Sequence, residues 1–104
     1  MAGAGDNPTR VILKWREPLK NWQVYLLKCA DHSLYCGITN NLDVRIDVHN
    51  SGKGAKYTRG RLPVELVAAT DKMTKSDALK FEIRIKKFPA GKKLSILEKG
   101  IDQK

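Results

Sequence analysis

The sequence predicts an α+β fold in which a small three-stranded antiparallel sheet is flanked by helices. Two short segments rich in β-branched and aromatic residues, 23–29 and 34–39, flank the tetrapeptide Ala-Asp-His-Ser and predict a β-hairpin. A third apolar segment, 62–69, predicts another strand, with a proline near its start where a missing amide is tolerated. The segment from Thr74 to Pro89 has helical apolar spacing and helix-terminating signals.

The chain divides into one domain and two short terminal segments. Its 104 residues suffice for a single compact domain, which we place at residues 22–99. Residues 1–21 show no sustained hydrophobic period and predict a flexible or loosely docked N-terminal extension. Residues 100–104 form a polar tail.

The predicted hairpin brings two tyrosines together. If its loop is residues 31–33, Ala30 pairs with Leu34 and residues of equal parity share a face. Tyr25 and Tyr35 then project from the same side of the sheet. A loop of two or four residues would undo this inference.

The cysteines and histidines do not have the spacing of a zinc site. Cys29 and Cys36 cannot form a metal cluster unaided, and His32 and His49 are not spaced as zinc-finger ligands. In the predicted register the two cysteines face opposite sides of the sheet, which makes a disulfide between them sterically implausible. Both are expected to be buried strand residues.

A short helix is predicted from Leu42 to Asn50. Asn40 and Asn41 are candidate N-caps, and glycines after residue 50 predict its end. The apolar residues also alternate as they would in a strand, so the caps, together with the family resemblance described below, favour the helix. Arg45 and His49 are four residues apart and share one helix face.

Residues 50–61 form a basic segment, predicted as a loop with one aromatic residue, Tyr57. No acidic residue occurs in it, and its glycines allow a ligand to approach the backbone. It lacks the spacing of a P-loop. The segment is a candidate contact for nucleic-acid phosphates, against the alternative of a solvated flexible loop. The candidate nucleic-acid-binding residues are Lys53, Lys56, Tyr57, Arg59 and Arg61.

The helix that begins at Thr74 carries a carboxylate within its apolar stripe. Asp77 follows Thr74 at the spacing of a capping box. Glu82 shares the stripe of Ala78, Phe81 and Ile85, where a charged group needs a reason. The simplest reason is an i, i+4 ion pair with Lys86. A further short helix is expected after Gly91.

The charge of the chain favours a polyanionic partner. Its 20 basic and 11 acidic residues leave a net charge of +9, which attracts nucleic acid, although a well-hydrated basic surface is the alternative. No stretch predicts a membrane span, a signal peptide or a basic amphipathic helix with a large apolar face. The protein is therefore expected in the cytoplasm, away from membranes.

The order of these residues resembles that of the GIY-YIG nuclease superfamily. The first half-motif is Gln23-Val24-Tyr25 and the second is Tyr35-Cys36-Gly37, followed by Arg45 and Glu82. Residues 22–90 more narrowly resemble the small stand-alone proteins of the YhbQ-like, UPF0213 type. The hairpin, the arginine, the basic segment and the glutamate in this order form a specific combination.

The resemblance implies a GIY-YIG-like fold and a metal-dependent endonuclease that hydrolyses phosphodiester bonds in DNA, such as branched, damaged, repair or recombination intermediates. It implies that Tyr25 deprotonates or orients a water, Arg45 stabilises charge on the phosphate, and Glu82 holds Mg²⁺ or Mn²⁺. Tyr35 would shape the site, and His49 would be an auxiliary base, a hydrogen-bond donor or a structural residue.

The chain also departs from the family pattern, which bears on the strength and geometry of catalysis, and two other functions stay open. Residues 23, 24 and 36 differ from the usual motif, and no asparagine follows Asn50 where many members have one. The alternatives are a nucleic-acid-binding module with little or no cleavage, or an adaptor that contacts a protein through Trp15 and Trp22. RNA is the alternative to DNA, and a protein partner would supply specificity.

Overall fold

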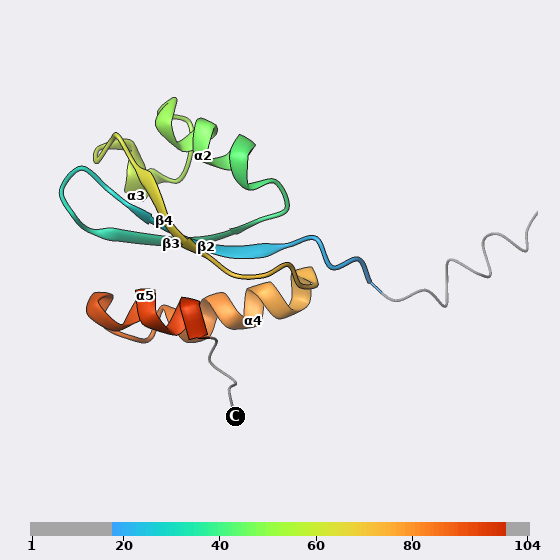
Figure 1. The fold of residues 1–104 in the computed structure, drawn as a ribbon. Helices are drawn as coiled ribbons and strands as arrows, with labels where there is room; N and C mark the ends of the chain where they lie inside the picture. Colours follow the sequence, from blue (N-terminus) through green and yellow to red (C-terminus); the bar gives the residue numbers. More distant parts are fainter. Residues whose placement is uncertain (1–17, 100–104) are drawn as a thin grey trace, which may run out of the picture.

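The computed structural model describes residues 18–99, which form one three-stranded sheet between two helical layers (Figure 1). The strands are β2 (Gln23–Lys28), β3 (Leu34–Thr39) and β4 (Glu65–Ala69), in the order β3-β2-β4, and both pairings are antiparallel. The predicted α+β class is confirmed. Trp15, the polar tail and most of the N-terminal extension lie outside the described residues.

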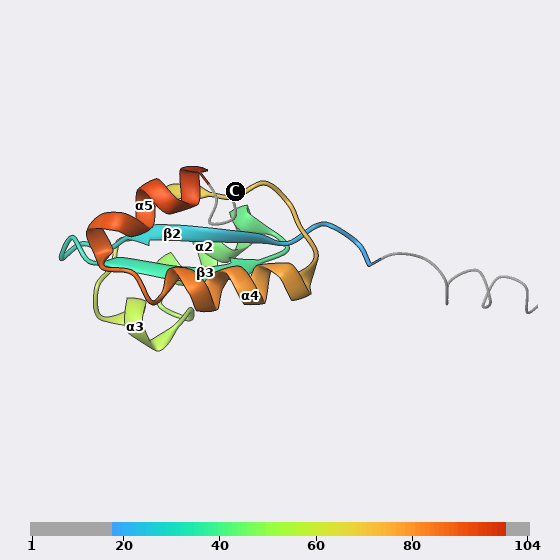
Figure 2. The same cartoon turned by 90° about the horizontal axis from the view of Figure 1, so that it is seen from below.

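Two helices cover each face of the sheet. On one face lie α2 (Leu42–Asn50) and the short α3 (Lys56–Arg59); on the other lie α4 (Lys75–Ile85) and α5 (Ala90–Lys99) (Figure 1). The perpendicular view shows α4 running beside the edge strand β3 (Figure 2), which it contacts together with β2. Between residues 18 and 99, no helix combines the length and apolar character that spanning a membrane requires.

The central strand β2 is buried on both faces, and its alternate side chains enter two different clusters. Val24 and Leu26 pack with residues of the α4–α5 layer, including Ala78 and Ile85. Tyr25 and Leu27 lie in the opposite cluster, beneath α2 and α3. A two-residue period along β2 therefore assigns one set of side chains to each layer.

The hairpin prediction was wrong in its pairing but correct in its parity. Lys28, not Ala30, pairs with Leu34, so the connection is residues 29–33. Asp31 accepts the Ser33 amide at 3.0 Å, and His32 has a left-handed φ of 71°, a conformation that closes a longer turn. Because this loop also has an odd number of residues, Tyr25 and Tyr35 still project from one face.

The two cysteines are buried free thiols on opposite faces, as their parity predicts. Cys36 belongs to β3, whereas Cys29 lies just after the end of β2. The prediction that both are strand residues was therefore wrong for Cys29. The 29–33 connection already starts there, because the Cys29 carbonyl accepts the amide of His32 at 2.9 Å.

The third strand begins at Glu65 rather than at Leu62. Pro63 has no amide to donate to a neighbouring strand. The Val64 amide and carbonyl are instead bonded to the side chain of Asn50, at 2.8 and 3.1 Å. The C-terminal residue of α2 therefore fixes the entry into β4.

The predicted helices have the expected caps. Asn41 accepts the Val44 amide at the start of α2, and Thr74 accepts the Asp77 amide at the start of α4. α2 has the predicted bounds, and Gly52, with a φ of 84°, follows its end. The basic segment was predicted as a loop, but it contains the helical turn α3. This turn is held by tertiary contacts that a local sequence pattern does not reveal.

Candidate active site

Tyr25 is a buried phenol whose position depends on the glycine opposite it. The residue is 1% exposed and pairs with Gly37 across the β2–β3 ladder. A Cβ on Gly37 would lie 2.7 Å from the Tyr25 hydroxyl and 3.0 Å from the Tyr35 ring. Glycine at this position therefore leaves the space that the Tyr25 ring occupies, which is the physical reason for the Tyr-X-Gly pattern.

The Tyr25 hydroxyl contacts two residues of α2. It lies 2.9 Å from Nε2 of His49, and the Arg45 side chain hydrogen-bonds to it. His49 is 0% exposed, so its ring has no access to solvent. The shared helix face predicted for Arg45 and His49 therefore points to the first tyrosine of the motif.

A second hydrogen bond fixes the tautomer of His49. Its Nδ1 lies 2.9 Å from Oγ1 of Thr58, which is itself fully buried. The Thr58 hydroxyl donates its only proton to the Ala55 carbonyl, also at 2.9 Å. The hydroxyl must then accept from Nδ1–H of His49, which leaves Nε2 as the acceptor for the Tyr25 proton.

Gly54 lets the basic segment pass close to this imidazole. A Cβ at Gly54 would lie 2.8 Å from Cα and 2.9 Å from Cγ of His49, closer than real side chains approach. The segment therefore packs directly on His49. At Gly60, in the same basic segment, an added Cβ would meet nothing within 4 Å.

Burial sets the protonation states of the phenol and the imidazole. It raises the pKa of Tyr25 to about 12, although the Arg45 hydrogen bond and charge act in the opposite direction. Burial, followed by the charge of Arg45, lowers the pKa of His49 below its usual value. At neutral pH the site therefore contains a protonated phenol beside a neutral imidazole that can accept its proton.

Tyr35 joins this pair to the basic segment. Its ring centroid lies 6.3 Å from that of Tyr25 and 5.2 Å from that of His49. On its other side it stacks on Tyr57 at 6.1 Å, and the Arg61 guanidinium lies 4.0 Å from the Tyr57 centroid. Burial is the main cause that raises the pKa of Tyr35.

Glu82 approaches the site from the opposite helical layer. Its carboxylate pairs with the Lys86 ammonium at 3.1 Å, the i, i+4 pair that the sequence offered as the simplest explanation. α4 packs against β3, the strand that carries Tyr35 and Cys36. After burial, the charge of Glu82 is among the causes that raise the pKa of these two residues.

A divalent ion would find one carboxylate ligand here. No group of three or more His, Cys, Asp or Glu side chains converges anywhere in residues 18–99. Burial, and then the charge of Glu82, raise the pKa of the Cys36 thiol to about 12, so it does not offer a thiolate. Glu82 fits Mg²⁺ or Mn²⁺ as a single ligand, because Mg²⁺ retains waters and takes substrate phosphate oxygens.

The structure separates the predicted site residues into two groups. Tyr25, Tyr35, Arg45 and His49 come together on one face of the sheet, and Glu82 lies on α4, which packs against β3 from the other face. Both arginines of the basic segment are bonded to other residues of the protein. Arg61 pairs with Asp31 at 2.9 Å, and Arg59 donates to the Gly54 carbonyl at 3.1 Å. Lys53 and Lys56 are exposed, as is the outer part of Tyr57.

Sequence reasoning missed Thr58 and misplaced Trp22. Thr58 stands out in the sequence only as an uncharged β-branched residue among basic ones. Trp22, predicted as an adaptor contact, is half-buried against the α4–α5 core, pairs with Met73 and carries Lys75 over its ring. Its ring is therefore part of the fold rather than an open docking surface.

Comparison with known proteins identifies the same region. Residues 21–93 match the family model described as the GIY-YIG catalytic domain. The UPF0213 protein OB0043 of Oceanobacillus iheyensis is 51% identical over 75 residues, which cover 72% of this chain and 87% of that protein. The UPF0213 protein YsiG of Lactococcus lactis is 44% identical over 84 residues, covering 80% of this chain and 81% of that protein.

A solved structure has the same fold. The solution NMR structure of the E. faecalis protein EF2693 is 38% identical to this chain, with a TM-score of 0.54. The match covers 80% of this chain and 88% of that one. Tyr25, His49, Thr58 and Glu82 all fall within the segment that the family model matches.

Proposed function

Because the chain belongs to the GIY-YIG catalytic domain family, and within it to the small UPF0213 proteins, we propose that it is a metal-dependent endonuclease that hydrolyses phosphodiester bonds in DNA. The observation that carries the proposal is the directed hydrogen bond from the Tyr25 hydroxyl to Nε2 of His49. It gives a phenol with a high pKa a place to put its proton.

In the proposed reaction, a water attacks the scissile phosphorus. The Tyr25 oxygen accepts a proton from that water while the Tyr25 proton passes to Nε2 of His49. His49 becomes an imidazolium that still donates from Nδ1 to Thr58. The bond from phosphorus to the leaving oxygen breaks, and this oxygen takes a proton from solvent. The imidazolium then returns its proton to the Tyr25 oxygen, which releases one to solvent, so that the neutral imidazole is restored.

Arg45 and Glu82 have electrostatic roles in this proposal. The Arg45 guanidinium, beside the Tyr25 oxygen, stabilises negative charge on the attacking oxygen and the phosphate. Glu82 would hold Mg²⁺ or Mn²⁺, which when bound neutralises phosphate charge as a Lewis acid. Lys86, which occupies the carboxylate in the protein alone, would then be released towards the substrate.

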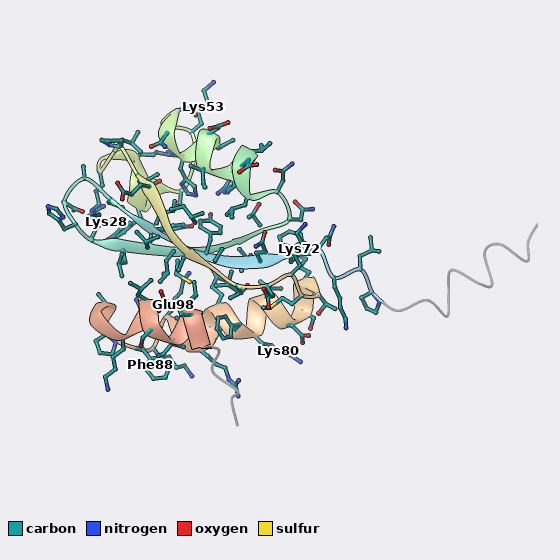
Figure 3. The ribbon with its side chains drawn as sticks, viewed as in Figure 1. Lys28, Lys53, Lys72, Lys80, Phe88 and Glu98 are labelled. Atoms are coloured by element: carbon teal, nitrogen blue, oxygen red, sulfur yellow. The ribbon has the colours of Figure 1, made fainter. Side chains whose placement is uncertain are left out.

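The test is cleavage of labelled single-stranded, duplex, flapped and branched DNA, and of RNA, with Mg²⁺, Mn²⁺ or chelator. Tyr25→Phe keeps the ring and removes the proton relay, so cleavage should fall by about 10²- to 10⁴-fold. Glu82→Gln should abolish metal-dependent cleavage and leave DNA binding intact. Glu98→Gln, the same change at an exposed site on α5, is the control (Figure 3).

Several outcomes would change the proposal. Preferential cutting of flapped or branched DNA would support a role in repair or recombination, and cutting of RNA alone would replace the substrate. Cleavage that survives Glu82→Gln would remove the metal assignment. Binding of every substrate without cutting would support a nucleic-acid-binding module; the pairing of Glu82 with Lys86 fits this alternative.

A further inference from the structure

Residues 84–96, which comprise the end of α4, the turn that follows it and the start of α5, form a second basic segment, here called the α4–α5 turn. It lies on the other face of the sheet from residues 50–61. Between Ile83 and Leu97 no acidic residue occurs. The stretch contains five basic residues: Arg84, Lys86, Lys87, Lys92 and Lys93. Figure 3 shows Phe88, in this turn, and Lys53, in the first basic segment, on opposite sides of the sheet.

This second segment begins inside the candidate active site. Lys86, the C-cap residue of α4, pairs with the Glu82 carboxylate at 3.1 Å. α4 packs against the edge strand β3, which carries Tyr35, and against α5, which carries Lys92 and Lys93. The basic residues at the end of α4 and the start of α5 therefore follow directly from the helix that carries Glu82.

Tyr35 connects the two basic segments. On one side it contacts Tyr57, which belongs to the first segment. On the other face, α4, whose C-cap is Lys86, packs against β3, the strand that carries Tyr35. The two basic segments therefore flank the same edge strand from opposite faces of the sheet.

We propose that the α4–α5 turn binds phosphates of the same nucleic acid strand that is cleaved, on the far side of the scissile phosphate from residues 50–61. The inference rests on the proposed function. A nucleic acid strand repeats a negative charge about every 3.4 Å per strand, so a strand centred on Tyr25 and Glu82 meets cations in both directions. The exposed Lys87 and Lys92 are the outer contacts.

The test separates this surface from a general effect of charge. Lys87→Glu/Lys92→Glu reverses two exposed charges and leaves Lys86, which pairs with Glu82, and Lys93 unchanged. Lys20→Glu/Lys72→Glu makes the same change in net charge at exposed positions, and Lys72 lies at the other end of the molecule from the turn (Figure 3). Binding to labelled duplex and single-stranded DNA is measured by fluorescence anisotropy with chelator, so that no cleavage is needed.

The expected result is a loss of affinity of about tenfold or more for the turn variant at moderate salt, with a much smaller loss for the control. The slope of log affinity against log salt should fall by about 1 for each lost phosphate contact. Equal weakening of both variants, or wild-type affinity in the turn variant, would overturn the inference. DNA-independent binding of anionic vesicles lost only in the turn variant would assign the surface to a membrane instead.

These outcomes are distinct from those that test the nuclease. A protein that binds through the turn and cleaves nothing would retain this inference and lose the proposed function. A protein that cleaves DNA and ignores the turn substitutions would do the reverse. A wild type that binds no nucleic acid would refute both.

Discussion

The two faces of the sheet bury different kinds of side chain. Towards α4 and α5, the central strand contributes Val24 and Leu26 to a cluster of apolar residues. Towards α2 and α3, it contributes Tyr25, which meets the fully buried His49 and Thr58. Apolar burial is favourable by itself, whereas each buried polar group costs about 1–3 kcal/mol if its hydrogen bond is lost.

This difference divides the work of the domain. The buried cluster on the α4–α5 face is apolar and supplies stability; Glu82, at its margin, is the exception. The α2–α3 face buries a proton donor, Tyr25, beside a proton acceptor, His49, and each is hydrogen-bonded to a neighbour. Substitutions on the first face should therefore act mainly on the free energy of unfolding, and those on the second should also act on cleavage.

The largest expected effect on stability is that of Ile85→Ala. Ile85 is 0% exposed in the apolar cluster, so its truncation should lower the free energy of unfolding by about 2–5 kcal/mol. Ile83→Ala, two residues away and 59% exposed, is the matched control and should change it by less than about 1 kcal/mol. Urea unfolding measures both; similar losses in the two variants would contradict the assigned core face.

Gly54→Ala tests the packing of the basic segment on His49. The added Cβ would collide with the backbone and ring of His49, which should cost about 1–3 kcal/mol of stability. Cleavage should fall as well, because the imidazole must move away from Tyr25. Gly60→Ala is the control, since a Cβ there meets nothing within 4 Å. Equal thermal shifts for the two variants would show that the close approach at Gly54 is unimportant.

Thr58→Val tests the direction of the proton relay. Removal of the hydroxyl leaves Nδ1–H of His49 without its acceptor, which should cost about 1–2 kcal/mol and favour the other tautomer. Nε2 then no longer accepts from Tyr25, and cleavage should drop by about tenfold or more. Thr58→Ser, which keeps the hydroxyl, should behave as the wild type.

The readout for Thr58 need not depend on activity. Nitrogen-15 NMR of the imidazole distinguishes a protonated Nδ1 from a protonated Nε2, and the wild type should show protonated Nδ1. An unchanged tautomer in Thr58→Val would show that another group orients His49.

The lowered pKa of His49 predicts a pH effect of definite sign. His49 takes a proton near pH 6.5 in the unfolded chain, whereas burial lowers its pKa in the folded protein. The stability that this group contributes is therefore present above the unfolded pKa and is lost as pH falls through the folded pKa. The wild type should lose stability as pH falls below about 6.5. Its cleavage should fall only at lower pH, where the folded imidazole itself takes a proton. In His49→Gln this component of the stability loss should disappear. The lowered pKa of Asp31 acts only below 3.8, outside this window.

The sequence could predict the parts of the fold that depend on local pattern. The caps Asn41 and Thr74, the bounds of α2 and the shared face of Tyr25 and Tyr35 follow from capping residues and from a period of two. The hairpin pairing was wrong because the turn is closed by the bond from the His32 amide to the Cys29 carbonyl, with His32 in the left-handed region, and no residue pattern marks either feature. The prediction of a loop at residues 50–61 missed the helical turn α3, because tertiary contacts stabilise this turn.

The site was predictable only where a side chain carries its own chemical signal. Tyr25, Arg45 and His49 do so, and the structure places them next to one another. Thr58 acts through its hydrogen bond to His49, nine residues earlier in the sequence. This contact joins α3 to α2, which can approach each other because residue 54 is a glycine. The charge pattern predicted that Arg61 contacts phosphate. In the structure its guanidinium pairs with Asp31 and lies over the Tyr57 ring.

The smallest expected effect on stability is that of removing the Glu82–Lys86 ion pair. Glu82 lies in the apolar stripe of α4 and is also the proposed metal ligand. Lys86 is half exposed, so Lys86→Met should change the free energy of unfolding by only about 0.3–0.5 kcal/mol. The same substitution should raise the affinity of the free protein for Mn²⁺, measured by electron paramagnetic resonance, because the lysine no longer competes for the carboxylate. Lys80→Met, on an exposed part of α4, is the control. If Mn²⁺ affinity is the same in both variants, the carboxylate does not hold the ion, and Glu82 serves the helix rather than the reaction.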